Sequence, residues 1–170
     1  DDRHFLVTGF HREDLHVPYT TESDGRNLTL FSIDERLRYL IPFRPPAETA
    51  NYLRGLAARG KPLAVLADDG EKFGGWPGTR EWVYEKGWLD QFISTMSALV
   101  DGGEVLLTTF AEALTAVAPG GLAYLPTASY REMEGWSLPN DAARRLIALE
   151  RELGEERLAG PDGALVRGAH

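Results

Sequence analysis

Residues 61–79 read KPLAVLADDGEKFGGWPGT, and this stretch decides the predicted fold. Leu63 to Ala67 form a run of five apolar residues with turn-forming residues at each end, which is typical of a short strand buried on both faces. Carboxylates and glycines follow from residue 68 onward. In parallel α/β folds the chemistry gathers at the carboxyl ends of strands, so this loop is the first place to look for a site.

Segments with strand and helix patterns alternate around this stretch. Upstream we predict strands at residues 28–33 and 37–43, and a helix from Pro45-Pro46 to Gly60. Downstream we predict helices at 79–100, 110–117 and 139–158, with strands at 104–108 and 122–125 between the first two and after the second. This alternation predicts an α/β fold with parallel strands and helical crossovers, either a barrel or a doubly wound sheet.

Composition excludes several classes of function. The 170 residues carry 18 Lys plus Arg against 26 Asp plus Glu, a net charge of −8 with a sequence pI of about 5.0. An acidic chain is a poor match for a phosphate backbone, so we expect no nucleic-acid partner. Cysteine is absent, which removes disulfides and thiolate chemistry. No apolar run approaches about 18 residues, so we expect no membrane span, and a cytoplasmic location fits this composition.

The loop after residues 63–67 holds the densest group of functional side chains. Asp68, Asp69 and Glu71 place three carboxylates within four positions. Their mutual repulsion favours the protonated form of one of them, which is what a general acid near neutral pH requires. Trp76 offers a flat apolar face suited to stacking on a sugar ring. A solvated acidic turn is the plain alternative, and a calcium loop is disfavoured because the required ligand spacing is absent.

A second loop combines carboxylates with aromatic side chains. Residues 126–139 follow a predicted strand and contain Glu132, Glu134, Tyr130 and Trp136. Ser137 and Pro139, at the end of this loop, are typical of the start of a helix, so they have a structural explanation that requires no function. The three early histidines are spaced by seven and five residues, which does not match a helical metal pair, so we predict no metal site.

Four motifs resemble one known family. They are residues 37–46 (LRYLIPFRPP), 68–79 (DDGEKFGGWPGT), 84–89 (YEKGWL) and 132–139 (EMEGWSLP). Together they resemble glycoside hydrolase family 57, in its branch of 4-alpha-glucanotransferases and related alpha-amylases. The similarity runs along nearly the whole chain.

The resemblance implies a fold, an activity and a set of site residues. Residues 1–138 would form the C-terminal half of an incomplete (β/α)7 barrel. Residues 139–170 would form the start of the helical region that follows it. The activity would be cleavage or transfer of alpha-1,4-glucosidic linkages with retention of configuration, on an alpha-glucan or maltooligosaccharide and without cofactor. Asp69 would be the general acid/base. The implied substrate contacts are Asp68, Glu71, Trp76, Glu132, Glu134 and Trp136.

The resemblance also implies that half of the chemistry lies elsewhere. The family nucleophile is a Glu in a motif upstream of the segment resembling residues 1–5, and retaining chemistry needs two carboxyl groups about 5–5.5 Å apart. We therefore expect the 170-residue chain alone to be inactive on glucan. Hydrolysis and transfer stay open alternatives, and the rival of another class is a carbohydrate-binding or regulatory module without catalysis.

Overall fold

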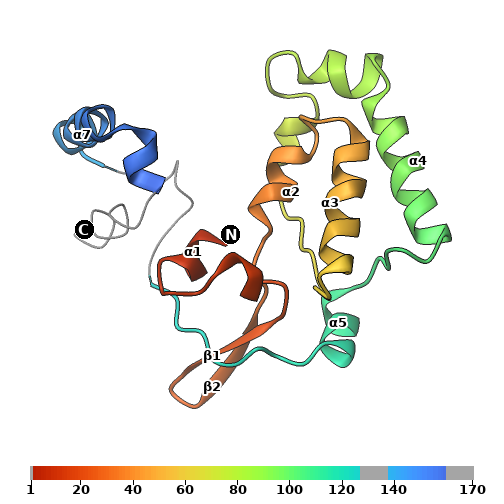
Figure 1. The fold of residues 1–170 in the computed structure, drawn as a ribbon, viewed down its shortest axis with the longest axis horizontal. Coiled ribbons are helices and arrows are strands. Elements are labelled where there is room, and N and C mark those ends of the chain that lie inside the picture. The colour runs from red at the N-terminus through yellow and green to blue at the C-terminus, as the bar shows by residue number, and fades with distance from the viewer. Residues whose placement is uncertain (1, 127–137, 160–170) are drawn as a thin grey trace. The chain divides into compact units, whose positions relative to one another are not determined.

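The structure is a computed structural model that describes residues 2–126 and 138–159. The chain divides into two units, Asp1–Thr127 and Ala128–His170. In the first unit, helices α2 (Glu35–Leu40), α3 (Pro46–Ala58) and α4 (Trp88–Asp101) pack side by side, as Figure 1 shows. In the second unit the described residues form α7 (Asn140–Ala159).

The described part of the first unit also contains seven shorter elements. They are α1 (Arg3–Leu6), η1 (Arg12–Asp14), β1 (Tyr19–Ser23), β2 (Arg26–Leu30), η2 (Gly70–Phe73), the π-helical turn η3 (Glu81–Glu85) and α5 (Phe110–Ala116). The prediction of a domain boundary near residue 138 stays a prediction.

Strands β1 and β2 form an antiparallel hairpin. The register pairs Tyr19 with Leu30 and Ser23 with Arg26, which leaves Asp24 and Gly25 as a two-residue loop. Both loop residues have positive φ, 51° and 73°, as the tight turns that suit the twist of a hairpin require. The strand predicted at 28–33 is therefore confirmed in part, since β2 ends at Leu30.

The strand predicted at residues 37–43 is wrong, because this segment begins as helix α2. The Asp34 carboxylate accepts a hydrogen bond from the Leu37 amide at 3.2 Å and so caps the helix. Leu37, Leu40 and Ile41 are all buried, and their i, i+3, i+4 spacing is that of a helix face. The apolar run resembles a strand only if this spacing is overlooked.

Most of the helix predictions are confirmed. Helix α3 has a proline in its first turn, α5 begins with Thr109 and Glu112 bonded reciprocally as a capping box, and α7 covers the predicted segment. The single helix predicted at 79–100 is instead two pieces, η3 and α4. Gly87 separates them with a φ of 72°, which a helix cannot contain.

The segments predicted as parallel strands at 63–67, 104–108 and 122–125 are not helical, but within the described part of the chain they form no strand ladder. Single backbone contacts join two of these segments to neighbours, since the Asp34 amide donates to the Val65 carbonyl at 2.8 Å and Thr20 forms a parallel bridge with Leu122. Elsewhere, the Asp2 amide donates to the Ile33 carbonyl at 3.1 Å.

These extended segments also differ from the prediction in their burial. Leu66, expected to be covered on both sides, is 41% exposed, and Leu106 is 81% exposed. A strand is shielded from solvent on both faces only when neighbouring strands and helices cover it. The described residues therefore cover only part of the apolar surface of these segments.

Two apolar clusters stabilise the first unit. One contains the buried side chains of Leu37, Leu40, Ile41, Val83 and Trp88, and the other those of Phe5, Leu15, Tyr19 and Ala123. The first cluster joins α2 to η3 and α4, because its buried side chains come from all three elements. The Trp88 indole N–H also donates to the Arg44 carbonyl at 2.7 Å, and its ring stacks on Phe92. Phe73 of the loop at residues 68–79 packs against this cluster, which therefore supports the loop.

Across residues 2–126 and 138–159, we find no helix with the length and apolar character needed to cross a bilayer.

Candidate active site

The loop that follows segment 63–67 winds around one backbone carbonyl, that of Glu71. This oxygen accepts hydrogen bonds from the amides of Gly74, Gly75 and Trp76, at 3.3, 2.7 and 3.1 Å. A Cβ atom on Gly75 would lie 3.1 Å from the same oxygen, so the close winding favours glycine there. The three bonds fix the point at which the Trp76 side chain leaves the backbone.

Asp68 lies at the base of this loop and faces inward. Its side chain is only 4% exposed. The Oδ1 atom accepts hydrogen bonds from Arg38 Nε at 3.1 Å and from the Asp69 amide at 2.9 Å, and the Oδ2 atom accepts one from Lys72 Nζ at 2.7 Å. A buried carboxylate requires such partners, because without them its desolvation would cost several kcal/mol.

Asp69, the next residue, points the other way. Its side chain is 54% exposed, and its Oδ2 atom lies 3.7 Å from Arg38 Nη2. The backbone at Asp69 is extended, with φ −76° and ψ 129°, so consecutive side chains project to opposite sides. Of these two adjacent carboxylates, the loop therefore exposes that of Asp69 to solvent and keeps that of Asp68 in the protein interior.

The guanidinium group of Arg38 forms ion pairs with both Asp68 and Asp69. Burial opposes the charge of Arg38, but the hydrogen bond and attraction of Asp68, together with the charge of Asp69, raise the pKa of Arg38 above its usual value. Arg38 therefore stays charged at every physiological pH. The planar guanidinium can reach two acceptors with a fixed angle between them, which an ammonium group cannot do.

An exposed aromatic platform adjoins the charged groups. Trp76 is 43% exposed and stacks on Phe43, with ring centroids 5.8 Å apart and planes inclined by 24°. Lys72 Nζ lies 5.5 Å from the centroid of the Phe43 ring and 5.7 Å from that of Trp76. The flat faces of sugar rings carry apolar C–H groups, and exposed aromatic faces of this kind are suited to bind them.

The structure brings together some of the predicted site residues. Asp68, Asp69, Glu71 and Trp76 all lie on the loop after segment 63–67, and Glu71 is exposed. The roles assigned to these four stay predictions. The remaining predicted contacts, Glu132, Glu134 and Trp136, lie outside the described residues.

Three residues of this site were not predicted to take part. Lys72 could have been found from the sequence, since it stands four positions after Asp68 and can meet it within a single turn. Arg38 and Phe43 could not, because they come from α2 and the segment after it, about thirty residues upstream. Only the folded chain shows that they meet the loop.

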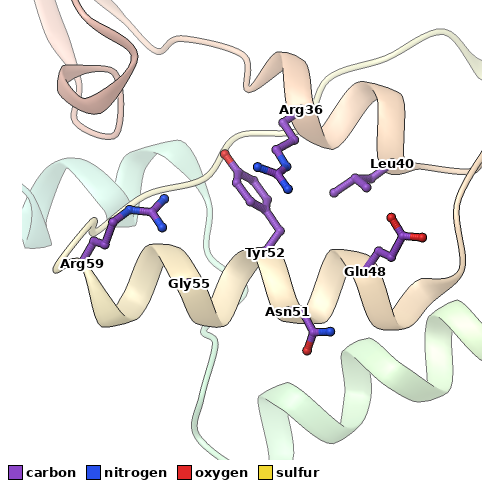
Figure 2. A pocket seen from close by; sticks show the side chains of 7 residues that line it. All are labelled: Arg36, Leu40, Glu48, Asn51, Tyr52, Gly55 and Arg59. Carbon is purple, nitrogen blue, oxygen red and sulfur yellow. The ribbon is translucent and has the colours of Figure 1, made fainter.

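Two hollows occur elsewhere on the first unit, and neither is lined by residues of the loop. One, of about 280 Å³, lies between α2 and α3, and Figure 2 shows Arg36 and Tyr52 side by side among its lining residues, with the guanidinium carbon of Arg36 4.8 Å from the centroid of the Tyr52 ring. The other, of about 320 Å³, contains Asp2, whose carboxyl is buried and ion-paired with Arg12. Burial, with a hydrogen bond and repulsion from Glu35, raises the pKa of Asp2 to about 7.

Within the described ranges 2–126 and 138–159, no three histidine or acidic side chains gather as metal ligands would. The charged groups at the loop are arranged as ion pairs of opposite sign, with two cations facing two carboxylates.

Comparison with known proteins identifies relatives with named activities. Residues 1–126 match the family model described as glycosyl hydrolase family 57. The 4-alpha-glucanotransferase of Thermococcus litoralis is 49% identical over 157 residues, covering 92% of this chain and 23% of that protein, and an alpha-amylase of Pyrococcus horikoshii is 46% identical, covering 99% of this chain and 26% of that protein. The crystal structure of the T. litoralis protein superimposes with a TM-score of 0.82, covering 92% of this chain and 24% of that one. The chain thus spans about a quarter of the length of these relatives.

Proposed function

Because the chain belongs to glycosyl hydrolase family 57, as its motifs suggested, we propose that it forms part of an enzyme that cleaves or transfers alpha-1,4-glucosidic linkages in alpha-glucans. The proposal is made for the full-length protein, because the chain covers only about a quarter of its named relatives. One observation carries it: the exposed carboxylate of Asp69 lies on the same loop as Trp76, whose exposed ring stacks on Phe43.

In this proposal Asp69 is the general acid/base of a retaining mechanism. It protonates the glycosidic oxygen as the leaving sugar departs, and then removes a proton from the acceptor, which is water in hydrolysis or a sugar hydroxyl in transfer. The exposure of Asp69 supports this role, because a proton donor must reach the substrate. The nucleophile is expected from a part of the polypeptide outside these 170 residues, and the chemistry needs no cofactor.

The other predicted residues become substrate contacts. Glu71 is exposed on the same loop and is proposed to bind sugar hydroxyls, while the Trp76 ring is proposed to stack on a sugar face. Glu132, Glu134 and Trp136 are proposed to complete the subsites. Asp68 was predicted with them, and its burial against two cations favours a contribution made through its neighbours.

We further propose that residues 1–138 are the second half of an incomplete (β/α)7 barrel, with the helical region starting at residue 139. The backbone hydrogen bond from the Asp34 amide to the Val65 carbonyl supports it, because it joins two non-helical segments that the barrel would place side by side. So does the exposure of Leu66, Leu106 and Leu107, which neighbouring barrel strands would cover.

The test replaces Asp69 by Asn in the full-length protein, which keeps the size of the side chain and removes the acid. We expect kcat on maltooligosaccharides to fall by about 10²–10⁴-fold, the usual contribution of a positioned acid/base, while binding persists. Asp101→Asn, at the exposed C-terminal end of α4, is the matched control and should keep its activity.

A rival proposal is a carbohydrate-binding module without catalysis, which the exposed Phe43–Trp76 pair alone would also support. It predicts that Asp69→Asn leaves the activity of the full-length protein unchanged, whereas Trp76→Ala reduces glucan binding. Unchanged activity of Asp69→Asn would therefore refute the enzymatic role and favour the rival.

A further inference from the structure

The groups beneath Asp69 form a closed ring of contacts. Arg38 Nε and Lys72 Nζ bind the two oxygens of Asp68, at 3.1 and 2.7 Å, and Lys72 Nζ also donates to the backbone carbonyl of Arg38 at 3.2 Å. The three residues come from α2, from the end of segment 63–67 and from η2. The ring therefore ties the start of the acidic loop to a helix of the supporting core.

This ring is connected to Asp69 at two points. The Asp69 amide donates to Asp68 Oδ1 at 2.9 Å, which holds the backbone, and Arg38 Nη2 lies 3.7 Å from Asp69 Oδ2, which directs the side chain. An aspartate that is half exposed on a glycine-rich loop would otherwise sample several rotamers. A proton donor must be held close to its reacting geometry, and misplacement by about 1 Å can cost about 10²-fold in rate.

The ring is also connected to the aromatic platform. The ammonium group of Lys72 faces the rings of both Phe43 and Trp76, at 5.5 and 5.7 Å from their centroids. Cations over aromatic faces are attracted by the ring quadrupole, more strongly where water is excluded, and Lys72 is only 4% exposed. The same ammonium group thus contacts the buried carboxylate and both rings of the proposed sugar platform.

We propose that Arg38, Asp68 and Lys72 are positioning residues, which hold the Asp69 carboxylate and the Phe43–Trp76 platform in one fixed relation. This inference rests on the proposed function, because it assumes that Asp69 donates the proton. Arg38 acts by directing the Asp69 side chain, Asp68 by holding its backbone, and Lys72 by joining the loop to the platform.

The test compares two substrates in the full-length protein. Cleavage of a maltooligosaccharide needs a proton on the leaving oxygen, whereas an α-maltosyl fluoride expels fluoride with little help from an acid. The kcat/KM value reports the steps up to cleavage of the first bond, so the ratio of the two kcat/KM values measures how well the acid works. A merely structural defect lowers the amount of folded enzyme and leaves this ratio unchanged.

We expect Arg38→Met to lower kcat/KM on the oligosaccharide by about 10–10²-fold, within the range that a positioned acid supplies, and to spare the fluoride. Arg38→Lys keeps the charge but loses the planar fork, and it should show a smaller change of the same kind; it also carries the test if Arg38→Met does not fold. Arg54→Met is the matched control, since Arg54 forms an exposed two-point ion pair with Glu104 on the surface.

Lys72→Arg tests the second connection, with the charge retained and the geometry changed. We expect KM for the oligosaccharide to rise, because the Phe43–Trp76 platform shifts. We also expect the ratio of the two kcat/KM values to change, because the Asp69 carboxylate shifts. Equal losses on the two substrates for Arg38→Lys and Lys72→Arg, or no loss for either, would overturn the inference.

The parallel Asp69→Asn measurement separates this outcome from failure of the proposed function. If Asp69→Asn itself leaves the oligosaccharide rate unchanged, Asp69 is not the acid and both proposals fail. If it abolishes that rate while the ratio stays unchanged in Arg38→Lys and Lys72→Arg, only the positioning role is refuted.

Discussion

The indole ring of Trp76 stacks on the phenyl ring of Phe43, with centroids 5.8 Å apart and 24° between the planes. Both rings are more than one-third exposed, so a pair that would ordinarily be buried in a core faces solvent. Phe43 lies in the segment after α2, and Trp76 lies in the acidic loop. The stacking therefore places an apolar surface from one segment beside the carboxylates of another.

Removing one ring of this pair should weaken substrate binding more than chemistry. Phe43→Ala leaves the Trp76 ring without its stacking partner, and aromatic pairs contribute about 0.5–1.5 kcal/mol beyond area burial. We expect KM for maltooligosaccharides to rise about 2–10-fold with kcat little changed, as this energy range implies. Steady-state kinetics check this, with Phe43→Tyr as the control that keeps the ring; a KM unchanged in Phe43→Ala would contradict the platform.

Trp88 should be the most costly side chain to remove from the core beneath the loop. It is 1% exposed, stacks on Phe92 and donates a hydrogen bond to the Arg44 carbonyl. Trp88→Ala should destabilise by about 3–5 kcal/mol, as is usual for large aromatic residues in cores. Trp88→Phe loses the hydrogen bond and part of the ring volume but keeps an aromatic ring in the core, so it should cost less.

Denaturant unfolding of the full-length protein measures the stability of both variants, and hydrogen exchange of the amides around Trp88 reports the unfolding of this part of the chain. Similar stability of Trp88→Ala and the parent would contradict the packing described here.

The stability of the full-length protein should depend on Asp2 between about pH 4 and pH 7. The folded state raises the pKa of Asp2 from 3.8 to about 7, chiefly through burial, so it holds the proton in a range where the unfolded chain has lost it. The favourable contribution of protonated Asp2 is complete below the unfolded pKa and is lost as pH rises through the folded one. Thermal midpoints of Asp2→Asn should therefore fall less than those of the parent across this range.

The parent protein is its own control at low pH, where its protonated Asp2 is as uncharged as the amide side chain of the Asp2→Asn variant. Parallel pH curves for the two proteins would show that Asp2 ionises as it does in an unfolded chain.

The start of helix α5 gives a second electrostatic prediction. The Thr109 amide, followed by the hydroxyls of Thr109 and Thr108, donates hydrogen bonds to Glu112 and holds its pKa below the usual value. The stabilisation is present above the ordinary pKa of a glutamate and is lost as pH falls through the lowered one. Thr109→Ala should move the pKa of Glu112 back toward its ordinary value.

The carboxyl ¹³C shift of Glu112, followed by titration in a segmentally labelled protein, measures this change. Thr115→Ala on the same helix serves as control, because its hydroxyl bonds the Glu112 carbonyl and leaves the carboxylate contacts intact.

Helices α3, α5 and α7 could be predicted because their signals are local. Pro46 at the start of α3 and the Thr109–Glu112 box at the start of α5 act within one turn, so the sequence alone contains them. At residues 37–43 the apolar run favours a strand, whereas the structure follows the cap at Asp34 and the helical spacing of Leu37, Leu40 and Ile41. Gly87 breaks the helix predicted at 79–100 through its positive φ, which a single glycine inside a helical pattern does not reveal by itself.

The site was predictable only in its contiguous part. Asp68, Asp69, Glu71 and Trp76 stand within nine positions, so a single motif presents them together. Arg38 contacts Asp68 although the two residues are thirty positions apart, and the spacing of residues in the sequence cannot predict a contact over that separation. The inward direction of Asp68 and the outward direction of Asp69 depend on that cation, so the sequence could not distinguish the two carboxylates by burial.

The most direct test of the central claim, that Asp69 donates the proton, uses aryl maltosides whose leaving groups range from weakly to strongly acidic phenols. Their kcat/KM values are measured for the full-length protein and for Asp69→Ala. We predict that the variant loses most activity, by about 10²-fold or more, on the weakly acidic phenols, and progressively less as the phenol becomes more acidic and needs no proton. A loss of equal size across the whole series would contradict the assignment of Asp69 as the general acid.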